Sequence, residues 1–258
     1  MDVVEGVGAL RAAHGRLFVV VGVFDGLHLG HRYLLGHLIR EAAARDARPA
    51  VITFDAHPDA VLTGSAPPLL LDPDDRLERL AAEGVEVTVV ERFDATLRDT
   101  PFEAFVERIR GRVDLAGFLM TPDAAFGHRR AGTPGALTTL GGRFGFDVVV
   151  VPPFALDGRA VRSSDIRAAI AAGELAEAAE LLGRPYSVVA ERDETDAGSG
   201  PGLVLGTRSP IAVPPDGPYR VVVDGREATA TLAAGRLALA SPVPSGPAAV
   251  HVDLIEPA

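Results

Sequence analysis

One stretch near the N-terminus, residues 17–31, constrains the fold more than any other part of the chain. Residues 17–21 form an unbroken apolar run, which is typical of a strand buried on both faces. Three glycines follow, and from His31 onward apolar residues recur at helical spacing. The pattern therefore predicts a central strand, a glycine-rich turn and a helix, the unit from which α/β folds are built.

The glycine-rich turn carries two histidines, His28 and His31, at the expected start of the helix. A helix N-terminus favours anions because its free N–H groups and its dipole act together, and an imidazole can add charge near neutrality. Metal ligation is an alternative, but it needs a third ligand and a regular helix, which the glycines disfavour. Capping or surface histidines are another alternative. We predict a site where fixed donors stabilise the charge that develops when a phosphate attacks the α-phosphate of a nucleoside triphosphate.

Strand and helix patterns alternate through residue 182. Such alternation predicts parallel pairing with right-handed crossovers, that is, a Rossmann-like α/β fold. We expect strands at residues 17–21, 50–54, 85–90, 115–120 and 148–151. We expect helices from residue 31, at 72–82 with Asp72 as N-cap, at 100–110 with Thr100 as N-cap, at 134–144, at 163–172 with Ser163 as N-cap, and at 174–182.

Unusual sequences follow four of the predicted strands, at residues 22–31, 55–58, 121–132 and 162–167. Ligands of open parallel sheets bind beyond the carboxyl ends of the strands, so we expect these loops to converge. In the last of them, the hydroxyls and N–H groups at a helix start, with Arg167 one turn in, suit a β- or γ-phosphate. A serine cap with a nearby arginine is also a common structural feature, which is the alternative interpretation.

The helical pattern ends near residue 184. Short alternating runs at residues 219–223, 228–232, 236–240 and 249–255 replace it and predict a small all-β module, truncated relative to a large barrel. Residues 193–201 are predicted to be a mobile loop.

Composition excludes several classes of function. A net charge of −10 disfavours nucleic-acid binding, which needs a basic face. The chain has no cysteine, lysine, asparagine or glutamine, so disulfides, thiolate zinc sites and a Schiff-base or P-loop lysine are excluded. No apolar run approaches the roughly 18 residues that span a bilayer, and the start lacks a secretory pattern. We expect a cytoplasmic protein without membrane or nucleic-acid partners; the oligomeric state stays unknown.

Five collinear motifs resemble those of the bacterial bifunctional riboflavin kinase/FAD synthetase family, chiefly its FMN adenylyltransferase module. They are GVFDGLHLGH at residues 22–31, TFDAHPDAVL at 53–62, AFGHRRAG at 125–132, VRSSDIR at 161–167 and LLGRPYSV at 181–188. The resemblance implies transfer of AMP from ATP to FMN, giving FAD and pyrophosphate, with Mg²⁺ carried by the triphosphate and metal ligands unknown. It implies an FAD synthetase-like nucleotidyltransferase domain at 1–184 and a riboflavin kinase-like β module at 185–258.

The resemblance, read with the turn and loops above, also implies three groups of site residues. The catalytic group is His28, His31, Ser164 and Arg167. The nucleotide-binding group is Gly22, Val23, Phe24, Asp25, Gly26, Gly30, Asp123, Phe126, Gly127, Arg129, Arg162 and Ser163. The flavin-binding group is Phe54, Asp55, His57 and Pro58. For His57, Phe54 and the basic loop 126–130, a structural loop histidine, a core phenylalanine and a solvated loop are the alternatives.

Departures from the family pattern qualify these expectations. Arg162 and Ser164 replace the usual serine and threonine, and Ala124 replaces a common aromatic residue. The kinase motif G-x-P-T-A-N corresponds to residues 206–211, where Arg208, Ser209 and Ile211 stand at the proline, threonine and asparagine positions; Ala249 stands at the catalytic glutamate. We therefore predict a degenerate module without kinase activity. Two alternatives stay open: transfer with another nucleoside triphosphate, modified flavin or other phosphate acceptor, and a flavin- or nucleotide-binding protein with little turnover.

Overall fold

A computed structural model of the chain describes residues 1–193, 202–205, 209–223, 225–240 and 249–258. Contacts within the chain divide it into two compact units. Unit 1 comprises Met1–Phe24, Gly30–Pro67 and Leu77–Ala155, and unit 2 comprises Asp25–Leu29, Pro68–Arg76 and Leu156–Ala258. Neither unit is one continuous stretch, so residues far apart in sequence must fold together to complete each.

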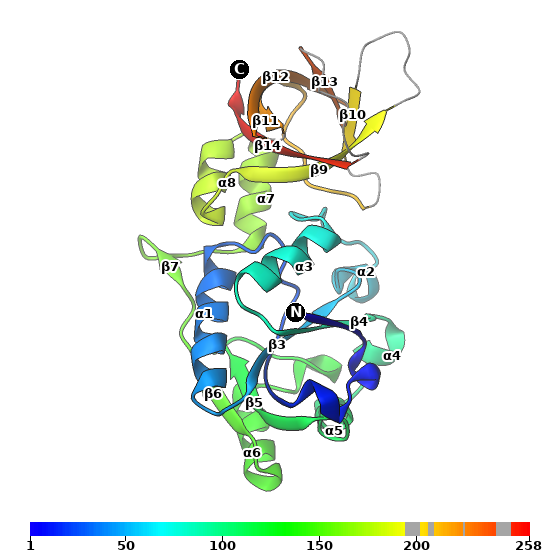
Figure 1. Cartoon of the computed structure of the whole chain (residues 1–258), viewed down its shortest axis with the longest axis vertical. Helices are drawn as coiled ribbons and strands as arrows, with labels where there is room; N and C mark the ends of the chain where they lie inside the picture. Colours follow the sequence, from blue (N-terminus) through cyan, green and yellow to red (C-terminus); the bar gives the residue numbers. More distant parts are fainter. Residues whose placement is uncertain (194–201, 206–208, 224, 241–248) are drawn as a thin grey trace. The chain divides into compact units, whose positions relative to one another are not determined.

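Unit 1 is built on a parallel sheet, which has six strands within the described chain, in the order β1-β4-β3-β2-β5-β6 (Figure 1). The strands are β1 (Asp2–Glu5), β2 (Arg16–Val21), β3 (Arg48–Phe54), β4 (Val87–Glu91), β5 (Asp114–Met120) and β6 (Asp147–Val150). Val19 of β2 pairs with Ala50 on one side and Phe118 on the other, which explains why this strand is apolar throughout its centre.

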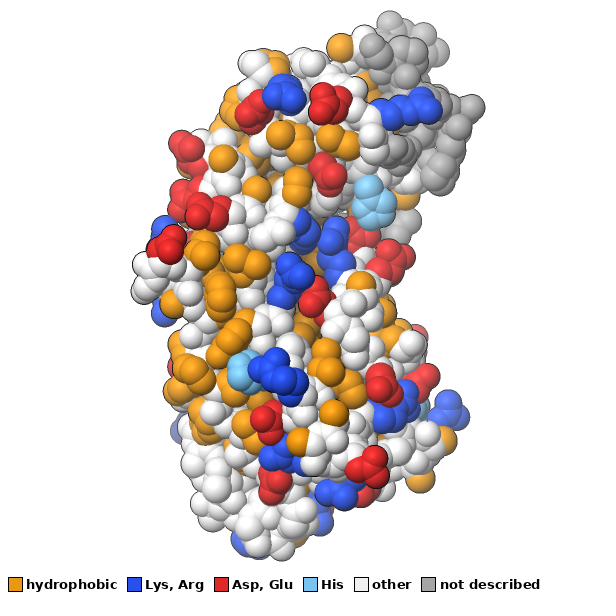
Figure 2. All heavy atoms as spheres, turned by 60° about the vertical axis from the view of Figure 1, so that its left-hand side comes forward, with side chains coloured by type: hydrophobic (Ala, Val, Ile, Leu, Met, Phe, Trp, Pro, Cys, Tyr) orange, Lys and Arg blue, Asp and Glu red, His pale blue; other side chains and the backbone are white. Residues whose placement is uncertain are grey.

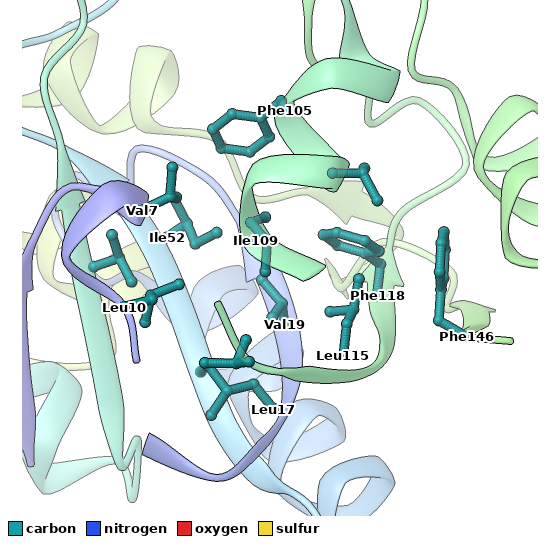
Figure 3. Close-up of a cluster of buried hydrophobic side chains, with 14 of the residues drawn as sticks. Val7, Leu10, Leu17, Val19, Ile52, Phe105, Ile109, Leu115, Phe118 and Phe146 are labelled. Atoms are coloured by element: carbon teal, nitrogen blue, oxygen red, sulfur yellow. The ribbon is translucent and has the colours of Figure 1, made fainter. Parts of the chain in front are cut away.

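Helices connect the strands of unit 1, and α1 and α3 each begin in unit 2. They are α1 (Leu29–Ala43), α2 (Asp59–Leu62), α3 (Pro73–Ala82), α4 (Ala95–Arg98), α5 (Phe102–Arg110) and α6 (Pro134–Phe144). Figure 3 shows one part of the core, where Phe105 and Ile109 of α5, together with Val7 and Leu10, pack against side chains of the sheet. The sheet residues labelled there are Leu17, Val19, Ile52, Leu115 and Phe118. The sheet, α5 and the 3₁₀ turn Val7–Ala9 bury their apolar side chains together.

The described part of unit 2 includes the helices α7 (Ser163–Ala172) and α8 (Leu175–Leu182) and a closed antiparallel barrel. The two helices are preceded by the short hairpin of β7 (Ala155–Leu156) and β8 (Arg159–Ala160). Among the described residues the barrel has six strands in the order β10-β13-β12-β11-β14-β9. They are β9 (Tyr186–Asp193), β10 (Gly202–Leu205), β11 (Gly217–Val223), β12 (Arg226–Ala233), β13 (Arg236–Leu239) and β14 (Ala249–Pro257).

The predicted fold class, a Rossmann-like parallel sheet followed by a small all-β module, is confirmed. The all-β strands close into a barrel, and β1, β9 and β10 were not among the predicted strands. The predicted mobile loop at 193–201 lies outside the described residues beyond position 193. The boundary at 184/185 stays a proposal, since the compact units divide the chain differently.

Two predicted helix caps are wrong. The N-cap of α5 is Pro101, while the Thr100 hydroxyl donates to the carbonyl of Thr96 at 2.7 Å. The N-cap of α7 is Arg162, and Ser163 is the first helical residue. In both cases the hydroxyl has a partner outside the helix that it was expected to cap.

Candidate active site

Strained backbone marks two of the loops that the sequence predicts to be functional. Among the described residues, seven non-glycine residues have positive φ, and four of them lie in these loops. Phe24 (φ 53°) and Leu27 (φ 39°) belong to the turn after β2, and Arg129 (φ 53°) and Arg130 (φ 56°) to the loop after β5. Such conformations cost of order 1–3 kcal/mol each and cluster at functional sites.

Gly26 gives the turn after β2 a packing that another residue would disrupt. Its φ is 82°, and a Cβ there would lie 3.0 Å from Leu70 Cδ1. Gly22 begins the turn, and its N–H donates to the carbonyl of Ile52 at 3.0 Å. The glycines of the motif therefore permit close backbone approach as well as an unusual conformation.

Asp25 is a buried acidic residue of the turn that accepts several hydrogen bonds. Its carboxylate is buried, with 3% of the residue exposed, and accepts from Leu70 N at 2.9 and 3.1 Å. Arg167 of α7 donates through Nη2 to Asp25 Oδ2 at 2.5 Å and through Nε to the carbonyl of Pro68 at 2.8 Å. The pair neutralises a charge that burial alone would make costly, and it fixes the guanidinium of Arg167.

The start of α7 is tied to the same turn. The hydroxyl of Ser163 donates to the main-chain carbonyl of Asp25 at 3.1 Å. Ser164 is exposed, with its hydroxyl 3.4 Å from Asp165 Oδ1, and the side chain of Arg162 is also exposed. The hydroxyl of Ser164 and the side chain of Arg162 therefore remain accessible to a ligand, whereas Ser163 and Arg167 are anchored.

His28 and His31 differ in their surroundings. His28 is buried, with 5% exposed, and burial lowers its pKa to about 4. His31 is partly exposed, and its ring centroid lies 5.1 Å from that of Phe24. Burial therefore disfavours the charged form of His28 at neutral pH, because a charged imidazole lacks hydration at this buried position.

The predicted flavin-binding residues lie in unit 1, at the end of β3 and directly after it. The Thr53 hydroxyl donates to the carbonyl of Val23 at 3.0 Å, which ties β3 to the turn after β2. The Phe54 ring packs edge-on against a second aromatic ring, Phe93, at 5.2 Å, and Asp55 Oδ1 accepts from the N–H of that same residue at 2.9 Å. His57 Nδ1 accepts from Asp59 N at 3.2 Å, and Pro58 is the N-cap of α2.

The loop after β5 is folded tightly onto α5. A Cβ on Gly127 would lie 2.7 Å from backbone atoms of Phe102. Phe126 packs against Phe105 and Phe118 with centroids 5.7 Å apart in each case. Arg129 is exposed at the loop tip, while Arg130 donates to the carbonyl of Asp123 at 2.9 Å. Phe126 thus has a core contact, and Arg129 is an accessible basic group of this loop.

The structure brings together part of the predicted site within each unit. Unit 2 holds Asp25, Gly26, His28, Arg162, Ser163, Ser164 and Arg167. Unit 1 holds Gly22, Val23, Phe24, Gly30, His31, Phe54, Asp55, His57, Pro58, Asp123, Phe126, Gly127 and Arg129.

Sequence reasoning missed the segment of residues 68–71 and Arg184. Leu70 N donates to the carboxylate of Asp25, and Arg184 Nη2 donates to the carbonyl of Gly26 at 2.9 Å. An apolar run at 69–71 directly before the helix cap Asp72 is the signal that could have indicated a buried segment. Arg184 gives no comparable signal, because its partner is a main-chain carbonyl 158 residues away.

Two features of the described part of the chain concern metals and membranes. No group of three or more His, Asp or Glu side chains there is arranged to hold a metal ion. No helix among those residues is long and apolar enough to cross a membrane. On the face shown in Figure 2, acidic and basic side chains are interspersed.

Comparison with known proteins adds independent findings. Residues 10–165 match the family model for FAD synthetase. A bifunctional riboflavin kinase/FMN adenylyltransferase of Haemophilus influenzae is 33% identical over 172 residues, which cover 66% of this chain and 56% of that protein. The enzyme of the same description from Escherichia coli (strain K12) is 30% identical over 191 residues, covering 73% and 61%. The chain thus matches less than two thirds of the length of these relatives.

A solved structure supports the fold of the whole chain. A crystal structure described as a macrolide-efflux protein from Streptococcus pneumoniae superposes with a TM-score of 0.81. It covers 100% of this chain and 90% of that one, at 23% sequence identity. This likeness concerns the fold alone.

Proposed function

Because the chain belongs to the FAD synthetase family, a family of nucleotidyltransferases, we propose that it transfers the adenylyl group of ATP to FMN. A phosphate oxygen of FMN forms a new bond to the α-phosphorus, the bond from that phosphorus to the bridging oxygen breaks, and pyrophosphate leaves. The acceptor phosphate is already anionic, so no protein nucleophile is required. The products are FAD and pyrophosphate.

The observation that carries this proposal is the link between the turn after β2, which leads into His28 and His31, and the start of α7. Asp25 lies three residues before His28, and it is bonded to Arg167 through its carboxylate and to Ser163 through its carbonyl. Residues of two motifs that stand 138 and 142 positions apart are therefore bonded within one unit. A triphosphate needs donors at both its reacting and its leaving ends, and these two motifs supply them.

We assign the following roles within the proposal. His28 and His31 stabilise the charge on the reacting α-phosphate, and His28 does so as a neutral N–H donor until a bound anion favours its protonation. The N–H groups at the start of α7, including that of Ser163, and the hydroxyl of Ser164 hold the β- and γ-phosphates. Arg167 adds positive charge there while its Nη2 stays on Asp25. The divalent cation that this family uses is Mg²⁺ in our proposal, carried by ATP as part of the substrate.

The remaining site residues line the two substrates. Gly22, Val23, Phe24, Gly26 and Gly30 form the turn beside the nucleotide in this proposal, with Asp123, Phe126, Gly127, Arg129 and Arg162 on the same substrate. Phe54, Asp55, His57 and Pro58 border the flavin. The net charge of −10 supports small molecules rather than nucleic acid as partners. We propose the cytoplasm, where ATP is available, as the location.

The test is a product screen with matched variants. Purified protein is incubated with FMN and each of ATP, CTP, GTP and UTP, and the products are identified by mass. We expect FAD and pyrophosphate with ATP; a product with another triphosphate alone would replace the assigned substrate. Tight FMN binding without pyrophosphate release from any triphosphate would instead indicate a binding protein.

The histidine roles have a separate test. His28→Ala and His31→Ala should each lower kcat by about 10²–10³, as loss of one fixed donor does in comparable sites, with a much smaller change in ATP binding. His251→Ala is the control, because this exposed histidine lies on β14 and is paired with Asp75 at 3.5 Å. A His28 or His31 variant within a few-fold of the wild type would remove the role assigned to that residue.

We also propose that the chain lacks riboflavin kinase activity. Ile211 and Ala249 stand at the asparagine and glutamate positions of the kinase motifs, and the chain has no asparagine at all. Residues 206–208 of the first motif lie outside the described residues. Formation of FMN from riboflavin and ATP above a no-enzyme control would contradict this proposal.

A further inference from the structure

Arg184 connects the start of the barrel to the turn that carries His28. It lies between α8 and the first residue of β9. Its Nη2 donates to the carbonyl of Gly26 at 2.9 Å, and its Nη1 donates to the carbonyl of Pro185 at 3.1 Å. Gly26 stands two residues before His28 and has a φ of 82°. The guanidinium therefore holds a carbonyl in the middle of the turn, at a residue with an unusual conformation.

A second connection passes through two adjacent leucines. Leu69 N donates to the carbonyl of Pro210 at 2.8 Å, and the carbonyl of Leu69 accepts from Ala212 N at 2.8 Å. The next residue, Leu70, donates to both carboxylate oxygens of Asp25. The segment of Leu69 and Leu70 thus joins residues 210–212 to Asp25.

The segment at 210–212 is in turn fixed to the barrel. Tyr186, the first residue of β9, is fully buried, and its hydroxyl donates to the carbonyl of Ala212 at 2.6 Å. Burial raises the pKa of Tyr186, so its hydroxyl stays a donor across the physiological range. The two connections therefore start at or next to the beginning of β9, since Arg184 precedes this strand by two residues and Tyr186 is its first residue. β9 is a barrel strand paired with β14 on one side and β10 on the other.

We infer that the barrel of unit 2 holds the turn Asp25–Leu29 in the conformation used for nucleotidyl transfer, with Arg184 as the positioning residue. The inference rests on the proposed function for its catalytic consequence. Arg184 acts on the reacting phosphates only through Gly26 and the two residues that follow it. A module whose kinase motif is altered thus contributes directly to the transferase site, by hydrogen bonds that require no kinase chemistry.

The experiment uses the full chain with Arg184→Ala and Arg184→Lys. Arg220→Ala is the matched control, because Arg220 is an exposed barrel arginine paired with Glu256. In FAD formation from FMN and ATP, Arg184→Ala should lower kcat by at least about tenfold, as loss of a charged hydrogen bond predicts, with the KM for ATP within about threefold. Arg184→Lys should be intermediate, and millimolar guanidinium should partly restore Arg184→Ala but not His28→Ala.

Amide hydrogen exchange gives a readout independent of activity. Peptides covering residues 22–31 should exchange faster in Arg184→Ala than in the wild type or in Arg220→Ala, at a temperature where all three are folded. Unchanged exchange in that segment would overturn the inference whether or not the wild type makes FAD. Faster exchange with kcat within about twofold of an active wild type would overturn the catalytic part. Failure of the wild type to make FAD from FMN and any triphosphate would instead overturn the proposed function.

Discussion

Replacing Asp25 with alanine should strongly destabilise the protein. The residue is 3% exposed, and its carboxylate accepts from Leu70 N and from Arg167. Its removal leaves a largely buried guanidinium and a buried N–H group without their acceptor. Breaking a buried charged pair by removing one partner typically costs about 3–5 kcal/mol, and we expect a loss of unfolding free energy in that range.

A double-mutant cycle separates the pair from other effects of the substitution. Arg167→Met keeps much of the side-chain volume and removes the charge. Because each single variant leaves one buried partner behind, Asp25→Ala and Arg167→Met together should be less destabilising than the sum of the two, by at least about 2 kcal/mol. Arg220 and Glu256 form the control cycle: their side chains are 52% and 51% exposed, and we expect coupling below about 1 kcal/mol.

Urea unfolding followed by far-UV circular dichroism, at fixed pH and salt, measures the free energy of unfolding of the wild type and of the six variants that make up the two cycles. The buried cycle should show strong coupling and the exposed cycle weak coupling. Additive effects at Asp25 and Arg167, with coupling under about 0.5 kcal/mol, would refute the argument that these two groups stabilise one another.

Three further predictions concern single residues. Burial lowers the pKa of His28 from 6.5 to about 4, so the folded state binds fewer protons than the unfolded state as the pH falls. The free energy of unfolding, measured in urea, should therefore decrease by about 3 kcal/mol between pH 7 and pH 4 through this residue, and His28→Gln should lack that decrease. Gly127→Ala should lower the free energy of unfolding by at least about 2 kcal/mol in the same assay, because Gly127 has a positive φ and a Cβ there would lie 2.7 Å from Phe102. Gly135→Ala on α6, where a Cβ would meet open space, should be neutral or stabilising. Equal effects of the two substitutions would contradict this reasoning. Tyr186→Phe should lose about 1–2 kcal/mol, since it leaves a buried carbonyl without its donor, and an unchanged melting temperature would contradict the bond.

Local pattern was sufficient for most of unit 1 and for the helices α7 and α8 of unit 2. The apolar run ending at Val21 became β2, and the helices predicted at 134–144 and 163–172 have the observed bounds. These elements are specified by the periodicity of their apolar residues and by local helix-ending residues such as Gly173, the C-cap of α7, whose φ is 82°. The wrong cap at Thr100 arose because its hydroxyl bonds to the preceding turn, which local pattern does not reveal.

The polar contacts of the site could not be predicted in the same way. The bond from Arg167 to Asp25 spans 142 residues, and that from Arg184 to Gly26 spans 158. Sequence motifs indicated that Asp25 and Arg167 belong to a site, but not that they bind each other. The lowered pKa of His28 likewise depends on burial by residues from other parts of the chain, which the sequence spacing of the motif does not reveal. Strand β1, only four residues long at a sheet edge, has too short a pattern to detect.

The interleaved composition of the two units has a consequence during synthesis. The chain passes from one unit to the other at residues 25, 30, 68, 77 and 156. When a ribosome has released residues 25–29 and 68–76, the partners of those segments in residues 156–258 have not yet been made. The histidine turn therefore leaves the ribosome long before Arg167 or Arg184 can fix it, and unit 2 must mature after translation of its last segment. Neither unit is encoded by a single continuous segment of the chain.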